Sequence, residues 1–377
     1  MKKSKGHVLL VSEYFLPHWT GISQAFFYLA KNLQNQGFDV QVLTTQFDKK
    51  LALEEEVRGV PVMRSPYQVR ISRTHYSFAL LMRFITLLPK YDWIVINSPN
   101  SNILFLSILT KLFGKKLAIY HQGDLTLPRQ TGSRAKHALM EKVFDALSIP
   151  SFLLANVTST YTRDYAAHSR VMKYALRTFR AHIPDFKAAQ GAPSKDFVKK
   201  MGALKKDHVL IGIAGRFVEE KGYEILMKAI SEIKKTVPNA HIVFAGKHLI
   251  DYEPFFELHK ELIQLHKNDI TFLGLLNEGD LAHFYKSIEV FVISSRSDCF
   301  PVTQIEAVHY GVPIVVTDIP GARMLVKESG FGAIAKPEDP FDLARIIIKV
   351  VTNKKKYLQN EKKAIQFLNK YEIYPLN

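Results

Sequence analysis

The sequence has little that would crosslink it or hold it in a membrane. Its single cysteine, Cys299, excludes an internal disulfide and favours a reducing compartment such as the cytoplasm. The longest apolar stretch, near residues 103–113, is interrupted by Lys111 and falls short of the roughly 20 residues that span a bilayer. The basic start is followed by only about five apolar residues, too few for a secretory leader. We expect a cytoplasmic protein that is soluble or peripheral on the inner face of the membrane.

Motifs that mark several other enzyme classes are also missing. There is no Asp-x-Asp pair, no cysteine and histidine spacing typical of zinc, no Walker phosphate loop and no Gly-x-Ser-x-Gly. The sequence therefore predicts neither a P-loop enzyme nor a hydrolase of that type. We expect no metal and no cofactor.

Negative charge is scarce in the first half of the chain. Residues 1–200 hold 28 Lys and Arg against 13 Asp and Glu, whereas the remaining residues hold 23 against 22. A positive surface of this kind attracts nucleic acid, an anionic membrane leaflet or a phosphorylated substrate. A merely soluble basic protein is the alternative.

Short β-rich apolar runs alternate with segments of helical period through both halves, which predicts an α/β protein. Strands are expected in the first half at 7–12, 39–45, 93–97 and 116–121, with helices at 23–36 and 101–113. In the second half, strands are expected at 209–215, 241–246, 270–274, 290–294 and 313–318, with helices near 254–266, 278–287 and 303–310. The pattern predicts two Rossmann-like, doubly wound parallel sheets facing across a cleft.

The predicted boundaries follow from this alternation. Residues 1–184 are expected to form the first domain, 185–207 a linker with a short helix, and 208–358 the second domain. The Lys-rich stretch 341–370 is expected to be helical, and residues 359–377 are expected to pack back on the first domain as a helix and tail.

The loop after the first strand of the second half carries two cations. Arg216 leaves the strand end, and Lys221 lies beside the start of the next helix. Two cations and a helix N-terminus suit a diphosphate whose oxygen becomes a leaving group. An ordinary loop with solvated charges is the alternative.

A second loop carries Asp298, with Glu306 inside the helix that follows it. Amides of Cys299 and Phe300, and those from Thr303 onward, can receive sugar hydroxyls or phosphate oxygens, and Glu306 can accept both hydroxyls of a ribose. A carboxylate in an otherwise apolar helix needs partners, which favours binding. A satisfied buried glutamate, with Asp298 as a loop cap, is the alternative.

Taken together, the segments GRFVEEKG (215–222), FAG (244–246), FLG (272–274) and SSRSDCFPVTQIEAVHYGVPIVVTDIPG (294–321) resemble glycosyltransferase family 4, of the GT-B fold. The resemblance implies a retaining transferase that moves a hexose from a UDP or GDP carrier to an acceptor hydroxyl, in cell-surface glycan or glycolipid synthesis. It implies that Arg216 and Lys221 hold the diphosphate, Asp298 and its neighbouring amides the sugar, and Glu306 the ribose. The sequence departs from the family at Asp298, where a glutamate is usual.

The resemblance in the first half is confined to strand ends. Gly21 falls in the position of the family's glycine-rich loop, where it lets backbone approach a phosphate or acceptor, unless it is only a turn before a cap at Ser23. His121 ends a strand where the family often has a histidine near the reacting sugar. With Asp298 and Lys221, it completes the expected catalytic residues, and a structural histidine is its alternative.

Two basic tracts suggest the acceptor. Residues 64–84 combine Arg64, Arg70, Arg73 and Arg83 with apolar side chains, and residues 169–180 form a second tract. We expect a nucleotide sugar as donor, a lipid-linked or phosphate-bearing acceptor, contact with an anionic membrane and no nucleic acid, against the alternative of solvated helix faces. Rival functions are a non-catalytic binder of nucleic acid or anionic surfaces, a sugar-nucleotide epimerase and a phosphorylase.

Overall fold

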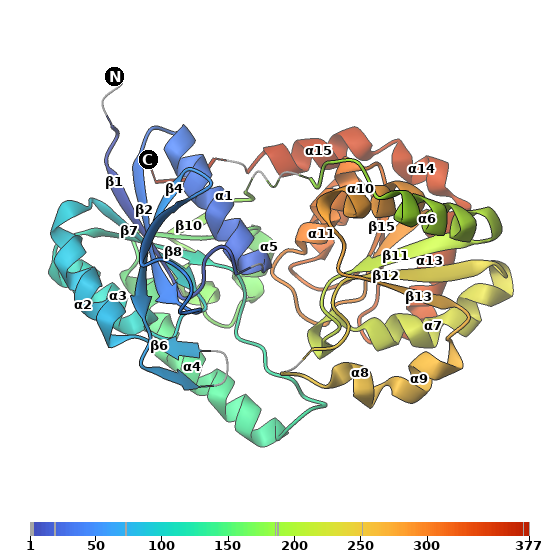
Figure 1. Cartoon of the computed structure of the whole chain (residues 1–377), viewed down its shortest axis with the longest axis horizontal. Coiled ribbons are helices and arrows are strands. Elements are labelled where there is room, and N and C mark those ends of the chain that lie inside the picture. The colour runs from blue at the N-terminus through green and yellow to red at the C-terminus, as the bar shows by residue number, and fades with distance from the viewer. Residues whose placement is uncertain are drawn as a thin grey trace. The chain divides into compact units, whose positions relative to one another are not determined.

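The structure is a computed structural model that describes residues 4–18, 20–71, 74–184, 186, 188–250, 252–371 and 373–376. The chain forms two compact units (Figure 1). Unit 1 comprises Met1–Leu125, Ala138–Phe186 and Tyr371–Asn377, and unit 2 comprises Thr126–His137 and Lys187–Lys370.

Unit 1 is built on a sheet that contains eight strands within the described residues, in the order β10-β9-β8-β7-β1-β2-β4-β3. Every neighbouring pair is parallel except β3 and β4. The strands are β1 (His7–Ser12), β2 (Asp39–Gln46), β3 (Glu54–Val57), β4 (Val60–Pro66), β7 (Trp93–Ser98), β8 (Lys116–His121), β9 (Val157–Thr160) and β10 (Phe179–Ala181), with a separate pair β5 (Val69–Ile71) and β6 (Thr74–Tyr76).

The helices of unit 1 form crossover connections between its parallel strands. They are α1 (Gly21–Asn35), α2 (Phe78–Leu87), η1 (Leu88–Lys90), α3 (Ile103–Leu112), α4 (Arg134–Leu154), α5 (Arg163–His168) and η2 (Met172–Ala175). Buried side chains of α2, α3, α4 and α5 join Ile94, Ile96 and Ile119 of the central strands in one apolar cluster, so these four helices cover the same face of the sheet.

Unit 2 has a second sheet, in which the described residues form six parallel strands in the order β13-β12-β11-β14-β15-β16. The strands are β11 (Val209–Ala214), β12 (Ala240–Ala245), β13 (Ile270–Gly274), β14 (Val290–Ile293), β15 (Ile314–Thr317) and β16 (Gly332–Ala335). The helices are α6 (Lys195–Asp207), η3 (Glu219–Lys221), α7 (Tyr223–Thr236), α8 (Phe255–Leu258), α9 (Lys260–Leu265), α10 (Glu278–Ser287), α11 (Val302–His309), α12 (Arg323–Ser329), α13 (Pro340–Thr352), α14 (Lys354–Leu358) and α15 (Glu361–Asn369). The two predicted α/β sheets are confirmed.

Several predicted helices differ in their ends or continuity. The helix expected at 23–36 begins at Gly21, and its cap is Thr20, whose Oγ1 accepts the Ser23 N–H at 3.2 Å. The helix expected at 254–266 is broken at His259. The helical stretch 341–370 is divided at Asn353 and Asn360. The Asn353 side-chain amide bonds the Lys349 carbonyl of the helix that it ends, and the Asn360 side-chain amide bonds the Gly330 carbonyl at the end of α12.

Both units include residues from outside their main segment. Residues 126–137 come from the first half of the sequence but belong to unit 2, whereas the predicted first domain, 1–184, contains them. Helix α15 packs against α11 and α12 in unit 2, whereas only the residues from Tyr371 onward belong to unit 1. The segment 359–377 is therefore divided between the two units, because the apolar side of α15 finds its partners in the second.

Candidate functional site

The candidate site in unit 2 is built from the loops that follow β11 and β14. These strands are hydrogen-bonded neighbours and run parallel, with Ile211 opposite Val290, so their carboxyl ends lie at the same edge of the sheet. Ligands of open α/β sheets bind at this edge. Arg216 and Lys221 are on the first loop, and Asp298 and Cys299 are on the second.

The two loops are fastened to each other through their backbones. Gly222 has φ of +61°, and a Cβ at this position would lie 2.2 Å from the Ser294 carbonyl oxygen. The Ser294 hydroxyl donates to the Lys221 carbonyl at 3.0 Å, and the Arg296 N–H donates to the Glu220 carbonyl at 2.8 Å. Only glycine satisfies both the left-handed φ and this close approach, and the contact fixes where Lys221 lies.

Arg296 reinforces this contact, although sequence reasoning gave it no role. Its Nη1 donates to the Glu219 carbonyl at 2.7 Å, and its Nη2 is paired with Glu224 and, at 3.0 Å, with Glu338. Burial alone would lower the pKa of Arg296, but its bonds to these two carboxylates raise it. The sequence offered one signal for this role, because Arg296 is the single cation of the segment SSRSDCF (294–300).

Charges of both signs meet at the first loop. Lys221 Nζ lies 2.6 Å from Asp298 Oδ2 and 4.0 Å from Glu220 Oε1, and Arg216 Nη2 lies 3.7 Å from the same Glu220 oxygen. Burial alone would lower the pKa of Lys221, but the attraction of Asp298 and Glu220 holds it above its ordinary value. Arg216 also donates to the Tyr252 hydroxyl. The sequence-predicted Arg216, Lys221 and Asp298 therefore lie together, with Glu220 as an unpredicted fourth member.

Glu306 lies one turn inside α11, as predicted, and one side chain bonds its carboxylate. Its Oε2 accepts the Tyr285 hydroxyl of α10 at 2.7 Å. Burial raises the pKa of Glu306, and the Tyr285 hydrogen bond opposes that rise. The carboxylate retains accepting capacity beyond this single bond.

The other predicted donor residues flank Asp298 and the start of α11. Phe300 is 2% exposed, so its side chain belongs to the core, and burial raises the pKa of the Cys299 thiol. Thr303 is the second residue of α11, one turn from Glu306. Pro301 at the N-cap provides no side-chain cap, which leaves the first-turn amides without that kind of acceptor.

Residues 126–137, which we name the strap, lie against this site within unit 2. The N–H groups of Arg129 and Gln130 both donate to Glu219 Oε2, at 2.9 and 2.8 Å, and Thr126 Oγ1 lies 3.4 Å from Ser297 Oγ. Glu219 is 6% exposed. Its carboxylate is thus an anchor for the strap, a role that the sequence reading missed because the two segments are far apart in the chain.

The two predicted residues of the first half, Gly21 and His121, lie in unit 1. Gly21 is the first residue of α1 and has no strained φ, and a Cβ there would have open space around it. The backbone therefore does not require glycine, and the predicted approach of a ligand remains a prediction.

His121 is 1% exposed at the end of β8. Its Nδ1 lies 3.1 Å from Ser98 Oγ and its Nε2 lies 3.2 Å from Asp124 Oδ1. Burial alone would raise the pKa of Asp124, but bonds from His121, Ser169 and the Arg170 N–H lower it to about 2. Both ring nitrogens are engaged, which favours the structural alternative, and the catalytic role of His121 remains a prediction.

Arg64 and Arg83 of the basic tract 64–84 are engaged within unit 1 rather than free at its surface. Arg64 is 0% exposed, because it lies on the interior strand β4, and it donates to the Leu16 carbonyl at 2.7 Å and pairs with Glu55. Arg83 pairs with Glu54. Arg73 lies outside the described residues, and so does the side chain of Arg70.

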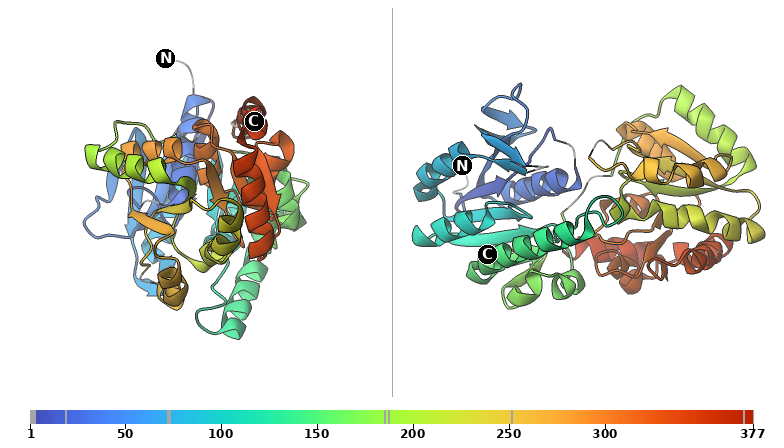
Figure 2. Two further views of the ribbon diagram at one scale, coloured as in Figure 1. Left: turned by 90° about the vertical axis from the view of Figure 1, so that its right-hand side faces the viewer. Right: turned by 90° about the horizontal axis from the view of Figure 1, so that it is seen from below.

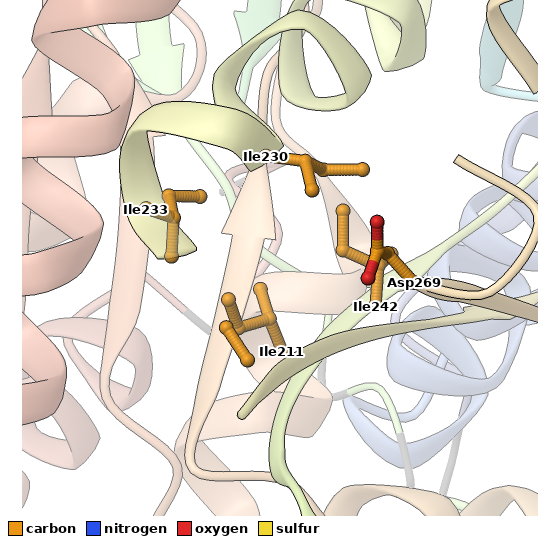
Figure 3. A pocket seen from close by; sticks show the side chains of 6 residues that line it. Ile211, Ile230, Ile233, Ile242 and Asp269 are labelled. Atoms are coloured by element: carbon orange, nitrogen blue, oxygen red, sulfur yellow. The ribbon is translucent and has the colours of Figure 1, made fainter. Parts of the chain in front are cut away.

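A small gap between α7 and strands β11 and β12, lined by isoleucines and Asp269, is too small to admit a water molecule (Figure 3). No cluster of three or more His, Cys, Asp or Glu among the described residues is arranged to hold a metal ion. The described helices also include none long and apolar enough to span a bilayer.

Two family models match the two halves of the chain. Residues 194–367 match the model described as glycosyl transferases group 1, and residues 19–175 match the one described as glycosyltransferase family 4. An uncharacterized glycosyltransferase of Methanocaldococcus jannaschii is 31% identical over 159 residues, which cover 42% of this chain and only 39% of that protein. The α-monoglucosyldiacylglycerol synthase of Streptococcus pneumoniae is 20% identical over 91% of this chain and 77% of its own length.

Solved structures show the same fold. Sucrose-phosphate synthase of Thermosynechococcus elongatus superposes with a TM-score of 0.73 at 17% identity, over 97% of this chain and 94% of that one. HepE of Anabaena, solved in complex with UDP-glucose, gives a TM-score of 0.72 at 15% identity, over 97% and 95%. At such identities the likeness concerns the fold alone.

Proposed function

Because the chain belongs to the glycosyltransferases described as group 1 and family 4, we propose that it is a retaining hexosyltransferase that uses a UDP or GDP sugar. The observation that carries the proposal is the pair of cations, Arg216 and Lys221, held around Glu220 and Asp298 at the carboxyl end of the unit 2 sheet. The fold and the class of enzyme need no further inference, whereas donor, stereochemistry and acceptor do.

The donor diphosphate would bind Arg216 and Lys221. Without donor, each cation is paired with a carboxylate, so the site carries little net charge. A diphosphate would take over these pairings, with the start of α7 adding its dipole. In the transfer, the bond from the anomeric carbon to the diphosphate oxygen breaks, and Lys221 stabilises the charge that develops there.

Glu306 would accept the ribose hydroxyls, as the resemblance implies. Its carboxylate has one partner, Tyr285, and lies one turn inside α11. The amides of Cys299, Phe300 and Thr303 would receive the sugar or phosphate oxygens, with Asp298 on a sugar hydroxyl. To bind the sugar, Asp298 would weaken its ion pair with Lys221 and accept a hydrogen bond from the sugar hydroxyl instead.

Retention follows from the family resemblance rather than from geometry. The acceptor oxygen would attack the anomeric carbon on the face that the diphosphate leaves, and the acceptor proton would pass to a departing phosphate oxygen. The cations take the place of a metal in this scheme, and neither metal nor cofactor is required. His121 would contribute near the sugar only if its bond to Asp124 opens.

The acceptor that we propose is lipid-linked or phosphate-bearing, in synthesis of a cell-surface glycan or glycolipid in the cytoplasm. Its support is the positive surplus of residues 1–200 and a relative named for a diacylglycerol product. Family membership argues against the non-catalytic binder. A sugar-nucleotide epimerase remains the second candidate, because it would need the same diphosphate site.

Thermal unfolding with a panel of UDP, GDP and ADP sugars tests the donor. We expect selective stabilisation by one base, rising with concentration as binding to the folded state requires. Lys221→Ala and Glu306→Ala should abolish transfer while the fold is retained, and normal turnover by either variant would refute the assignment. An epimerised sugar nucleotide produced without acceptor would establish the second candidate instead.

A further inference from the structure

Helix α4 has its polar and apolar sides reversed relative to an ordinary surface helix. The side chains that it buries include Glu141, Asp145, Ser148 and Ser151. The side chains that it exposes include six apolar ones: Leu139, Met140, Val143, Leu147, Leu153 and Leu154. Val143 and Leu147 are 50% and 54% exposed and lie one turn apart. Packing within unit 1 does not explain an apolar outer side on a helix of this length, whose course can be followed in Figure 2.

Helices α2 and α3 share this property. They cover the same face of the unit 1 sheet as α4, since buried residues of all three belong to one core cluster (Figure 1). Their exposed apolar side chains recur at helical spacing: Phe78 and Met82 on α2, and Phe105, Ile108 and Leu112 on α3. Leu112 is 75% exposed. We name these three exposed stripes the outer helix face.

The exposed charge that these three helices themselves carry is positive. Helices α2 and α3 contain Arg83 and Lys111 and no acidic residue, although Arg83 is paired with Glu54 of β3. The acids of α4, Glu141 and Asp145, are 5% and 9% exposed, and Asp145 is paired with Arg170, whereas Lys142 is exposed. Apolar side chains with cations between them match the boundary between anionic headgroups and acyl chains.

We infer that the outer helix face of unit 1 binds an anionic lipid bilayer. A second copy of the chain is a poorer occupant, because two such faces would bring cations against cations with no exposed acid on these helices to pair them. This places the lipid contact on α2, α3 and α4; of the arginines of 64–84 it includes Arg83 on α2 and excludes Arg64, which is internal. The inference rests on the proposed lipid-linked acceptor for its purpose, but it can be measured without donor or acceptor.

The test is flotation of the full chain with vesicles of phosphatidylglycerol and phosphatidylcholine, or of phosphatidylcholine alone, at about 50 mM and about 500 mM salt. The variant Val143→Glu/Leu147→Glu puts two carboxylates on the outer helix face. The matched control, Leu258→Glu/Leu265→Glu, changes two leucines of unit 2 that are 51% and 73% exposed. Circular dichroism verifies folding, and nucleotide-dependent thermal stabilisation reports unit 2 separately.

We expect binding to anionic vesicles that weakens at high salt and is at least about tenfold weaker in Val143→Glu/Leu147→Glu, because apolar insertion and charge attraction both decrease. The control should bind like the unchanged protein. Absence of binding at low salt, or equal binding by the Val143→Glu/Leu147→Glu variant, would overturn the inference. So would a dimer that light scattering detects and the same variant dissociates, since the occupant would then be a second copy. Donor stabilisation that persists alongside lost vesicle binding would leave the proposed function standing.

Discussion

At the scale of single residues, Glu306 is the group whose charge state bears most directly on donor binding. Its pKa is raised by burial and restrained by the Tyr285 hydroxyl. A raised carboxyl pKa means that the folded state holds the proton more tightly than the unfolded chain does. The stabilisation from this group is therefore present at low pH and is lost as pH rises through the folded pKa.

The affinity for nucleotide should depend on pH in the opposite sense to this contribution to stability. An ionised Glu306 accepts both ribose hydroxyls, so affinity for UDP or GDP should fall as the pH drops through its raised pKa. Tyr285→Phe removes the bond that lowers this pKa, so the fall in affinity should move to higher pH, with about 1 kcal/mol lost in stability. Calorimetric titrations across pH measure both effects. Tyr310→Phe is the control, since its hydroxyl bonds the Ala189 carbonyl instead, and a shifted profile there would contradict the assignment.

At the scale of elements, the Asp298 loop is shaped by a glycine that follows β15. A Cβ on Gly321 would lie 1.6 Å from the Asp298 carbonyl oxygen. Because that oxygen is a backbone atom, the loop itself would have to move to relieve the clash. Gly321 has no left-handed φ, so the constraint is purely one of space. The position of Asp298 beside Lys221 therefore depends on this contact.

Gly321→Ala should displace the Asp298 loop, separate it from Lys221 and weaken donor binding by about tenfold or more, as misplacement of a binding group does. The matched control is Gly202→Ala in α6, where a Cβ would meet no atom within 4 Å. That change should stabilise the protein by about 1 kcal/mol through helix propensity and leave donor binding unchanged. Nucleotide titration and thermal melts distinguish the two. Undiminished affinity in Gly321→Ala would show that the loop tolerates the shift.

The strap gives a second prediction at this scale. Glu219→Ala removes the acceptor of the Arg129 and Gln130 amides, and losing about 1.4 kcal/mol of local stability should raise the open population of the strap about tenfold. Trypsin should then cut after Arg129 and Arg134 about tenfold faster. Glu257→Ala, which removes an exposed carboxylate paired only at the surface, serves as control. Equal cutting rates in both variants would mean that Glu219 is not the anchor.

At the scale of the whole molecule, the end of the chain completes the first unit. Tyr374 is 0% exposed, its hydroxyl bonds Ser159 Oγ at 3.1 Å, and its ring packs on Tyr120 and His182. The Tyr374 N–H also donates to Asn32 of α1. Unit 1 is thus incomplete until the last residues are in place.

Tyr374→Ala should lower the free energy of unfolding of unit 1 by about 3 kcal/mol or more, because it leaves a cavity and an unpaired Ser159. Ile373→Ala, at a position 72% exposed, should change it little. Differential scanning calorimetry with and without nucleotide separates the units, since only unit 2 should be stabilised by the donor. A loss that appears in the nucleotide-stabilised transition would contradict this assignment of the tail.

Much of the fold could be predicted from the sequence because it depends on local patterns. The alternation of apolar runs and helical segments predicted both sheets, and the interrupted run near Lys111 predicted no spanning helix. Helix continuity was harder to predict: asparagines such as Asn353 interrupt a helix through bonds that propensity alone does not reveal. Ser23 was taken for a cap that Thr20 provides, since both residue types favour the N-cap position.

The candidate site was predictable where function depends on residues close in sequence and at the ends of neighbouring strands. Arg216, Lys221 and Asp298 could be expected together, because β11 and β14 bring their loops to one edge. Partners from distant segments could not be predicted: Tyr285 for Glu306, the strap amides for Glu219, and Glu55 for the internal Arg64. Hydrogen bonds between segments far apart in the chain leave no periodicity to detect.

The sequence by itself determined the two α/β sheets, the place of Arg216 and Lys221 on one strand-end loop and the positive first half, because strand period, loop position and charge are all local properties. Only the tertiary structure decided that His121 has both nitrogens engaged, that residues 126–137 belong to the second unit and that α4 turns its apolar side outward. Each of these depends on which side chains the packed core leaves room for, and burial is a property of the folded chain and not of any one segment.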